Sequence, residues 1–234
     1  MATAREAATE GAEDGLVIWA GSQKSGRGRT GREWSSPPGN LYCSLLLRPN
    51  CRADRAAELS FVTALSVWSS VASLLPRMVS VQCKWPNDIL VRGRKISGIL
   101  LESGAVSGNN VGWLIIGVGI NVASHPEVGL YPTTSLKTEG VNATVEEVLS
   151  GYLNAFAGWR DVWQSEGFAS VRRAWLEKAV GLGRQTTVRV GEQELVGRFE
   201  TIDDDGALIL VQSDDKRRIT AGDVFFGANR QEVG

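Results

Sequence analysis

The sequence predicts an α+β fold, in which an antiparallel sheet with flanking helices is followed by a small all-β barrel. Apolar strands between residues 79 and 119 follow one another with short connections, which is typical of an antiparallel sheet and not of a βαβ nucleotide fold. A stretch with helical periodicity precedes them at residues 53–75, and the hydrophobic period changes to two after residue 183. These observations predict one larger domain and a smaller C-terminal one.

The composition limits the functional classes. The chain has 234 residues, 43% of them hydrophobic, and a net charge of −1. This supplies a core, and the balanced charge argues against a dedicated nucleic-acid-binding protein. The three cysteines have no metal-ligand spacing and are expected to be reduced thiols in a cytoplasmic protein. No apolar run approaches the roughly 20 residues that cross a bilayer, so no membrane partner is expected.

The first third of the chain predicts two helices and two strands. Alanine and glutamate dominate residues 1–14, which predicts a short helix that ends at Gly11 or Gly15. The apolar runs 16–20 and 41–47 predict strands, and the second is expected in the middle of the sheet. Over residues 53–75 apolar side chains recur on one helical face, which predicts a core helix.

The middle of the chain completes the predicted sheet. Residues 122–139 are loop-like and contain the only histidine, His125, which has no cysteine or histidine neighbour and is therefore expected to be solvated rather than catalytic. The hydrophobic pattern predicts strands at 79–84, 89–91, 95–102 and 111–119, a tight hairpin at Arg92-Gly93-Arg94 and a turn at Asn109-Asn110.

Helices and then a β domain follow. Thr144 and Glu147 have the spacing of a capping box, which predicts a helix from about residue 145, and a second helix is expected to run to about residue 180. Gly181-Leu182-Gly183 marks a boundary between predicted domains at 1–181 and 182–234. Asp203-Asp204-Asp205-Gly206 is interpreted as a hairpin turn and not as a metal site, because strands flank it. The C-terminal strands are expected at 186–190, 194–202, 206–211, 216–220 and 223–226.

A glycine-rich basic loop at residues 21–34 is the first candidate for function. It carries Lys24, Arg27, Arg29 and Arg32 between glycines 26, 28 and 31, a density that excludes a stable helix or a well-packed strand. Arginine binds phosphate and carboxylate in a bidentate way, and amides next to glycine can approach an anion closely. The loop alone fits two interpretations equally well: a mobile loop that closes over an anion, and a solvated basic linker.

Two further polar clusters interrupt the apolar strands. Lys84 and Lys95 are unusual among buried neighbours, because lysine is rarely buried without a partner. Asn87 and Asp88 have the oxygen ligands that Mg²⁺ prefers, and the hairpin from Asp88 to Lys95 could turn both side chains toward one cavity. Cations, a carboxylate and strand-end glycines together suit phosphoryl or nucleotidyl transfer. Scattered surface charges would explain any one cluster, but explain three poorly.

Four motifs resemble those of biotin protein ligases, the biotin–[acetyl-CoA-carboxylase] ligases, in the right order and over nearly the whole chain. The resemblance implies a sheet like that of class II aminoacyl-tRNA synthetases and a small C-terminal barrel. No DNA-binding segment precedes these motifs, so the chain resembles the non-repressor type. The motifs are Gly26-Arg27-Gly28-Arg29-Thr30-Gly31-Arg32-Glu33-Trp34, Lys84-Trp85-Pro86-Asn87-Asp88, Lys95-Ile96-Ser97-Gly98-Ile99-Leu100-Leu101-Glu102 and Gly117-Val118-Gly119-Ile120-Asn121.

The resemblance implies an activity and its partners. Family members make biotinyl-5′-adenylate from biotin and ATP with Mg²⁺, and then pass the biotinyl group to one lysine of a carrier domain. The implied partner is the biotin carboxyl carrier domain of acetyl-CoA carboxylase or of a related carboxylase, with no DNA and no membrane. The family includes monomers and dimers, so the resemblance implies no oligomeric state.

The resemblance also implies site residues. Lys95 and Arg29 are the implied catalytic residues, and Asp88 is the implied Mg²⁺ ligand. Biotin is expected to contact Gln23, Gly26, Arg27, Gly28, Arg29, Lys95, Gly98 and Gly117. ATP is expected to contact Arg29, Arg32, Trp34, Lys84, Asn87, Lys95 and Asn121.

The chain departs from the family at its start. In the family a strand and a Ser-Thr pair, which contacts the ureido ring of biotin, precede the helix that here begins at Met1. Their absence predicts either a truncated chain or one that has lost part of its biotin site. Three hypotheses follow: a working biotin ligase, an inactive remnant that binds ligand weakly, and a lipoate or octanoate transferase. The third is disfavoured, because the basic loop and the Lys84–Asp88 motif are those of biotin ligases.

Overall fold

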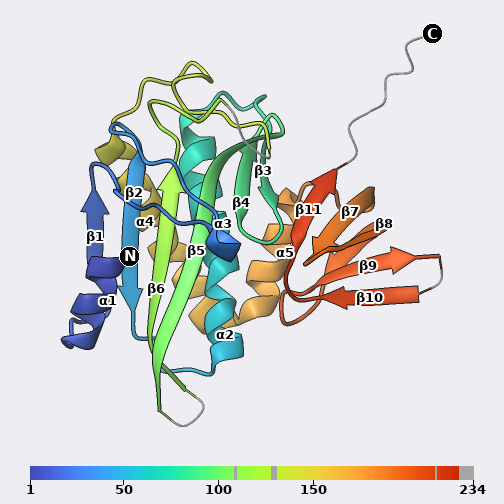
Figure 1. Ribbon diagram of the computed structural model, residues 1–234, viewed down its shortest axis with the longest axis horizontal. Helices are drawn as coiled ribbons and strands as arrows, with labels where there is room; N and C mark the ends of the chain where they lie inside the picture. The colour runs from blue at the N-terminus through green and yellow to red at the C-terminus, as the bar shows by residue number, and fades with distance from the viewer. Residues whose placement is uncertain (108–109, 128–130, 214, 227–234) are drawn as a thin grey trace.

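A six-stranded antiparallel sheet forms the centre of the molecule (Figure 1). The computed structural model describes residues 1–107, 110–127, 131–213 and 215–226. The strand order is β1-β2-β6-β5-β4-β3, and the antiparallel arrangement predicted from the short connections is confirmed. The predicted turn at residues 109–110 falls partly outside the described residues. The strands are β1 (Val17–Ala20), β2 (Leu41–Leu47), β3 (Val81–Lys84), β4 (Asp88–Val91), β5 (Arg94–Ser107) and β6 (Asn110–Ile120).

Three helices cover one face of this sheet (Figure 1). The helix predicted over residues 53–75 is two helices, because α2 ends at Ala57 and α3 begins at Leu59. The capping box is confirmed, since the Thr144 hydroxyl accepts from the Glu147 amide and the Glu147 carboxylate accepts from the Thr144 amide. The helices are α1 (Ala2–Thr9), α2 (Ala53–Ala57), α3 (Leu59–Leu74), α4 (Val145–Glu166) and α5 (Phe168–Lys178), of which α3, α4 and α5 form the covering layer.

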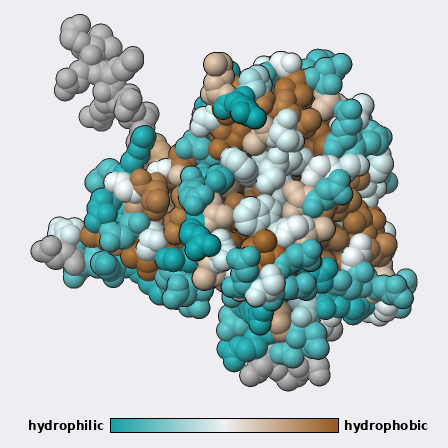
Figure 2. Space-filling model, turned by 180° about the vertical axis from the view of Figure 1, so that it is seen from behind, coloured by the Kyte–Doolittle hydropathy of each residue, from teal (hydrophilic) through white to brown (hydrophobic). Residues whose placement is uncertain are grey.

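By length and composition alone, the helical stretch Ala53–Leu74 is long and apolar enough to cross a membrane. Ten of its residues in α3 alone are buried, and they pack against the main sheet and against α4 and α5. Seen from behind, the surface over these helices mixes hydrophilic and hydrophobic residues, and hydrophilic residues dominate its lower part (Figure 2). The apolar composition of this stretch is therefore explained by its place in the core.

The opposite face of the sheet is only partly covered. Ala4 and Ala8 of α1 pack there against Leu46 of β2 and Ile115 of β6, with Met1 at the edge of this small cluster. The helix covers the sheet near its β1 edge. The polypeptide between β1 and β2, which contains the basic loop, crosses the rest of this face (Figure 1).

A second antiparallel sheet follows α5, in the strand order β10-β9-β8-β7-β11. The predicted hairpin turn is confirmed, since the Asp203 carboxylate accepts from the amides of Asp205 and Ala207 and the turn joins β8 to β9. The indole N–H of Trp85 donates to the carbonyl of Gly206 at 3.0 Å, which ties this sheet to the main domain. Its strands are β7 (Gln185–Val190), β8 (Gln193–Ile202), β9 (Leu208–Gln212), β10 (Asp215–Ile219) and β11 (Asp223–Phe226).

Candidate active site

A cleft of about 430 Å³ lies between the basic loop and the sheet face that α3, α4 and α5 leave free. Strands β4, β5 and β6 form its floor and the loop forms its cover, while β11 contributes Asp223 at one side. Of the site residues predicted from the sequence, only Gly26 and Lys84 do not line it. Those that do are Gln23, Arg27, Gly28, Arg29, Arg32, Trp34, Asn87, Asp88, Lys95, Gly98, Gly117 and Asn121.

The basic loop is folded as a small irregular hairpin. A single antiparallel bridge joins Arg27 to Glu33, and the amide of Gly28 donates to the carbonyl of Arg32 at 2.7 Å. One 3-10 turn lies between them, in which Thr30 has a φ of 53° and Gly31 a φ of 74°. The prediction that the glycines exclude a stable helix or a well-packed strand is confirmed, since the loop holds only this turn and a single bridge.

Two glycines of the loop differ in the space that the protein leaves for a side chain. A Cβ on Gly26 would lie 2.2 Å from the carbonyl oxygen of Trp34, so the loop itself cannot accept a side chain there. At Gly28 the backbone is extended (φ −97°, ψ −172°), and a Cβ would come no closer than 3.6 Å to the carbonyl oxygen of Arg32. Gly28 lines the cleft, and the protein itself leaves room for a Cβ at this position.

Trp34 lies directly over the glycines of the floor. A Cβ on Gly98 would lie 2.9 Å from Cζ3 of the indole ring, and one on Gly119 would lie 2.7 Å from Nε1. In the described part of the chain the Trp34 Nε1 is buried without a hydrogen-bond partner. Gly117, which the sequence predicts to face biotin, lines the cleft and also packs against Met1, since a Cβ there would lie 2.7 Å from the Met1 sulfur.

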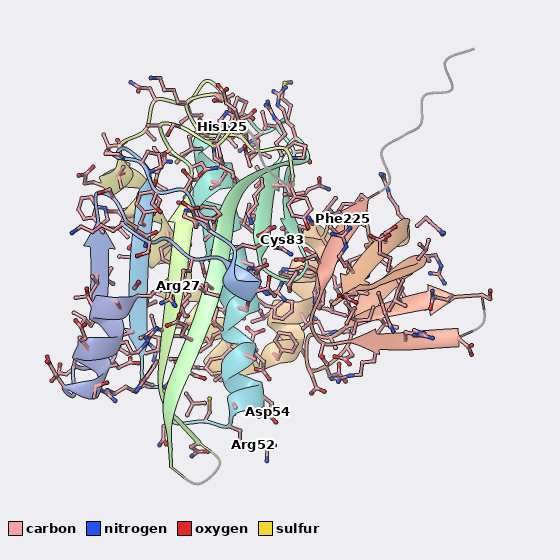
Figure 3. All side chains as sticks on the ribbon, viewed as in Figure 1. Arg27, Arg52, Asp54, Cys83, His125 and Phe225 are labelled. Atoms are coloured by element: carbon pink, nitrogen blue, oxygen red, sulfur yellow. The ribbon has the colours of Figure 1, made fainter. Side chains whose placement is uncertain are left out.

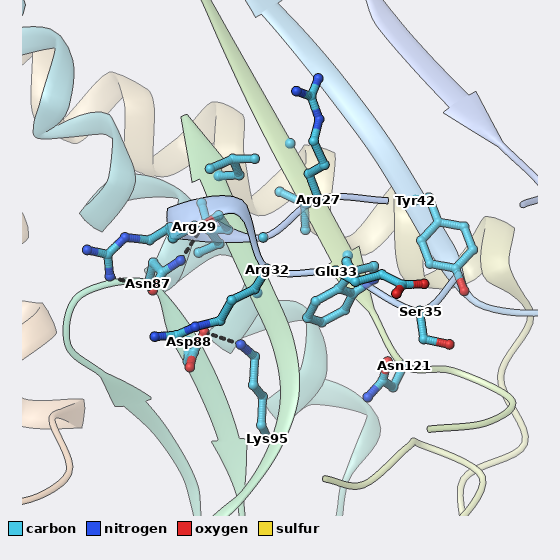
Figure 4. Close-up of a pocket in the computed structure, with 18 of the residues that line it drawn as sticks. Arg27, Arg29, Arg32, Glu33, Ser35, Tyr42, Asn87, Asp88, Lys95 and Asn121 are labelled. Carbon is cyan, nitrogen blue, oxygen red and sulfur yellow. Dashed lines mark hydrogen bonds and ion pairs between the residues drawn. The ribbon is translucent and has the colours of Figure 1, made fainter. Parts of the chain in front are cut away.

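The cations gather at one end of the cleft (Figure 4). The Lys95 ammonium lies 2.6 Å from Asp88 Oδ1, and Arg32 is ion-paired with Asp223, with Nη1 3.2 Å from Oδ1. Arg29 donates to Asn87 Oδ1 at 3.4 Å and to the carbonyl of Gly222 at 3.3 Å, and burial lowers its pKa. Each of these three cations thus has a protein partner that an anion could replace.

Arg27 differs from the other two arginines. It points away from Asp88 and Lys95 (Figure 4), and its guanidinium is 4.0 Å from Glu102 of β5. Its side chain is about half exposed. Arg27 is therefore the loop arginine with the loosest attachment to the rest of the protein.

Lys84 lies behind the cleft at the end of β3. The side chain is buried, and its ammonium is 3.7 Å from the centre of the Tyr131 ring, which in turn stacks on Phe225 of β11 at 5.2 Å. Burial lowers the pKa of Lys84 to about 8, while the nearby Asp88 carboxylate acts in the opposite direction. Burial raises the pKa of Tyr131 to about 12. A buried cation against a ring face is a stabilising arrangement, so Lys84 is held where it can supply positive potential to Asp88.

Several residues of the cleft were not predicted. Tyr131, Thr133 and Asp223 come from a loop and a strand outside the four motifs, and nothing in their local sequence marks them. Gly119 lies inside a motif and could have been found by its spacing from Gly117. His125 does not line the cleft: it lies among the loops at one end of the sheet (Figure 3), with Nδ1 3.1 Å from the Thr133 hydroxyl.

Comparison with known proteins gives the family. Residues 3–121 match the biotin/lipoate A/B protein ligase family, and residues 181–227 match the biotin protein ligase C-terminal domain. The chain is 42% identical over 216 residues to the biotin–[acetyl-CoA-carboxylase] ligase of Paracoccus denitrificans, with 90% of each chain covered. The chain belongs to the biotin protein ligase family.

Other biotin ligases agree with this assignment. The bifunctional ligase/repressor BirA of Bacillus subtilis is 31% identical to this chain over 231 residues, which cover 96% of this chain and 70% of BirA. The biotin protein ligase of Aquifex aeolicus, solved in complex with biotin and ATP, superposes with a TM-score of 0.78 at 26% identity and covers 95% of this chain and 93% of its own. The predicted family and fold class are confirmed.

The ligase offers one carboxylate for a metal ion in its cleft floor. No group of three or more histidine, cysteine, aspartate or glutamate side chains that could hold a metal occurs among the described residues. Asp88 lines the cleft, but one of its oxygens is paired with Lys95. A single carboxylate suits Mg²⁺ when phosphate oxygens and water complete the shell, so these residues fit an ion that arrives with a nucleotide.

Proposed function

We propose that this chain is a biotin–protein ligase that catalyses two half-reactions in the cleft. In the first, a carboxylate oxygen of biotin attacks the α-phosphorus of ATP, which gives biotinyl-5′-AMP and releases pyrophosphate. In the second, a lysine amine of a carrier protein attacks the acyl carbon, an amide forms and AMP leaves. The convergence of Lys95, Arg29 and Arg32 on one cleft, in a chain 42% identical to a biotin–[acetyl-CoA-carboxylase] ligase, carries this proposal.

Lys95 is the proposed catalytic cation. It lies on the floor at the start of β5, and its partner Asp88 keeps the ammonium at the cationic end of the cleft. A lysine there attracts the biotin carboxylate toward the α-phosphate and offsets the charge that accumulates on the phosphoryl oxygens as the new bond forms. Because the charge is fixed in position by β4 and β5, little reorganisation accompanies the reaction.

The other residues divide between the two substrates. We assign to ATP binding the residues Arg29, Arg32, Lys84, Asn87, Asn121 and the ring of Trp34. Arg29 is also assigned to the reacting phosphate. Gln23, Arg27, Gly28, Gly98 and Gly117 are proposed for biotin, and Gly26 supports the loop from behind. Asp88 would hold Mg²⁺ together with the phosphate oxygens of ATP, where the ion adds positive charge.

The proposed partner is a biotin carboxyl carrier domain, as the name of the Paracoccus relative, a biotin–[acetyl-CoA-carboxylase] ligase, implies. The proposed location is the cytoplasm, which suits the free thiols of Cys43, Cys51 and Cys83. Neither DNA nor a membrane has a role in the proposed reaction.

Biotin-dependent exchange of pyrophosphate into ATP tests the first half-reaction. Exchange that requires biotin, and labelling of a biotin carrier domain but not of a lipoyl domain, is the expected result. Labelling of the lipoyl domain alone would favour lipoate or octanoate transfer. A folded protein that neither exchanges pyrophosphate nor binds biotin by calorimetry would instead be an inactive remnant.

A further inference from the structure

Glu139 is a buried carboxylate that the proposed reaction does not use. Its side chain is only 4% exposed, and it lies in the loop that connects β6 to α4. Oε1 accepts from Arg94 Nη2 at 2.7 Å and from the Thr134 hydroxyl at 2.6 Å. Oε2 lies 3.4 Å from Arg92 Nε. A charge withdrawn from water to this extent is retained only with such partners.

The partners of Glu139 come from the hairpin that carries Lys95. Arg92 and Arg94 lie in and next to the tight turn between β4 and β5, and Arg94 immediately precedes Lys95. Arg92 has a φ of 51° and Gly93 a φ of 75°, so the hairpin turns sharply at this point. Glu139 therefore reaches across from another segment and fixes the turn through both arginines.

Thr134, the third partner of Glu139, belongs to a segment that pairs with the backbone of Lys95. The amide of Lys95 donates to the carbonyl of Pro132 at 2.8 Å, and the amide of Thr134 donates to the carbonyl of Lys95 at 2.9 Å. Both backbone groups of Lys95 are thus paired with the loop that contains Glu139. The same loop segment contributes Tyr131 and Thr133 to the cleft, and the Thr134 carbonyl accepts from the Asn121 side chain at 3.0 Å.

We propose that Glu139 is a positioning residue for the Lys95 ammonium, an inference that rests on the proposed function of the cleft. The Glu139 carboxylate joins Arg94, which precedes Lys95, to Thr134, which pairs with the Lys95 backbone. The start of β5 is therefore held on two sides. Asp88 fixes the far end of the same side chain. Because a displacement of about 1 Å can cost a reaction a large factor in rate, loosening this attachment slows adenylate formation.

The experiment compares Glu139→Gln, Glu139→Ala and the unchanged protein in a single turnover at saturating biotin and ATP. The rate of biotinyl-adenylate formation per active site is expected to fall about tenfold in Glu139→Ala and less in Glu139→Gln, which keeps a hydrogen-bond acceptor. The amplitude of the adenylate burst, which counts competent sites, is expected to stay the same. A merely structural role would lower the amplitude and leave the rate per site unchanged, and that result would overturn the inference.

Two sets of controls sharpen this test. Glu192→Gln removes an exposed carboxylate from the turn between β7 and β8 and is expected to leave rate and amplitude unchanged. Arg94→Ala removes the 2.7 Å contact and is expected to slow the reaction more than Arg92→Ala, which removes the 3.4 Å one. In a Lys95→Ala background Glu139→Gln should add no further loss, because residues that act through one another are not additive. An additive loss would contradict the inference.

The failure of this inference differs from a failure of the proposed function. An unchanged protein that forms no biotinyl-adenylate would refute the function of the cleft. An unchanged protein that forms it, with Glu139→Gln and Glu139→Ala at the same rate per site, would refute only the role of Glu139.

Discussion

The floor and the cover of the cleft are built in different ways. The floor consists of β4, β5 and β6, whose backbones are paired in the main sheet and whose opposite face packs on the buried helices. The cover is the basic loop, which one internal β-bridge closes on itself. It meets other segments through the Trp34 ring on the floor and through Arg29 and Arg32. The floor is fixed by the core, whereas the cover is held by the Trp34 ring and by polar contacts of its arginines that a ligand can exchange.

The difference teaches where binding and catalysis divide. A cation on the floor, such as Lys95, keeps its place whether or not substrate is bound, which suits stabilisation of a transition state. A cation on the cover, such as Arg32, has a carboxylate partner that phosphate can replace. Substitutions in the floor should therefore change the rate or the global stability, and those in the cover should change affinity and loop mobility.

The largest effect is expected from the floor at Lys95. Lys95→Ala removes the fixed cation, and biotin-dependent pyrophosphate exchange should fall by roughly 10²–10³-fold, the cost typical of one electrostatic group in a catalytic site. Thermal unfolding should confirm that the variant is folded. The exposed Lys137→Ala variant serves as the control for loss of a lysine. Near-normal exchange in Lys95→Ala would remove Lys95 from the mechanism.

The pH dependence of stability tests Lys84, the buried lysine behind the cleft. The pKa of Lys84 is about 8 in the folded protein against 10.5 for an ordinary lysine, so the unfolded chain binds more protons between these values. Stability contributed by Lys84 should therefore rise with pH from about 8 to 10.5, by roughly 3 kcal/mol at most. In urea unfolding, the free energy of unfolding of Lys84→Met should exceed that of the unchanged protein by most below pH 8. This difference in free energy should narrow as the pH rises. A difference that is constant with pH would show that Lys84 is not held as described.

A smaller effect is expected in the cover at Gly28. Gly28→Ala should leave the free energy of unfolding within about 0.5 kcal/mol, because the extended backbone accepts a Cβ, yet weaken binding of biotin or ATP about tenfold, because the Cβ enters the cleft. Calorimetric titration measures both affinities. Gly26→Ala is the contrasting variant, since its Cβ meets the Trp34 carbonyl and should disturb the loop without any ligand. Unchanged affinity in Gly28→Ala would place the ligand elsewhere.

The smallest functional effect is expected at Asp223. Asp223→Ala removes the partner of Arg32, and a partly exposed ion pair contributes no more than about 1 kcal/mol. The loop should nevertheless open more often, so trypsin should cleave between Lys24 and Arg32 several-fold faster than in the unchanged protein. Asp215→Ala, at the exposed start of β10, is the control and should be cleaved at the normal rate. Equal rates in all three proteins would mean that Asp223 does not hold the loop.

The sequence predicts the fold better than the full outline of the cleft. Local signals settle the strands, the Arg92-Gly93-Arg94 hairpin and the capping box at Thr144, because period, turn residues and cap chemistry act over a few neighbouring positions. The break between α2 and α3 was missed, since helical periodicity continues across Glu58. The 181/182 domain boundary stays a prediction.

The missing part of the site depends on tertiary placement. Asp223 and Tyr131 enter the cleft only because β11 and the loop after β6 pack beside β3 and β4, which no local pattern encodes. Gly117 is a related case. The sequence motif identifies this glycine, but it does not reveal that the side chain of Met1 packs against it. The roles of the individual motif residues toward biotin and ATP stay predictions.

Trp85 links the two sheets in a way that bears on how the molecule unfolds. Its buried indole bonds to the Gly206 carbonyl, and one continuous apolar cluster includes Trp85 and Val91 together with Phe199 and Leu208 of the second sheet. Neither sheet can lose its packing without exposing part of the core of the other. Heating should therefore give a single calorimetric transition, and the second sheet expressed alone should be poorly soluble.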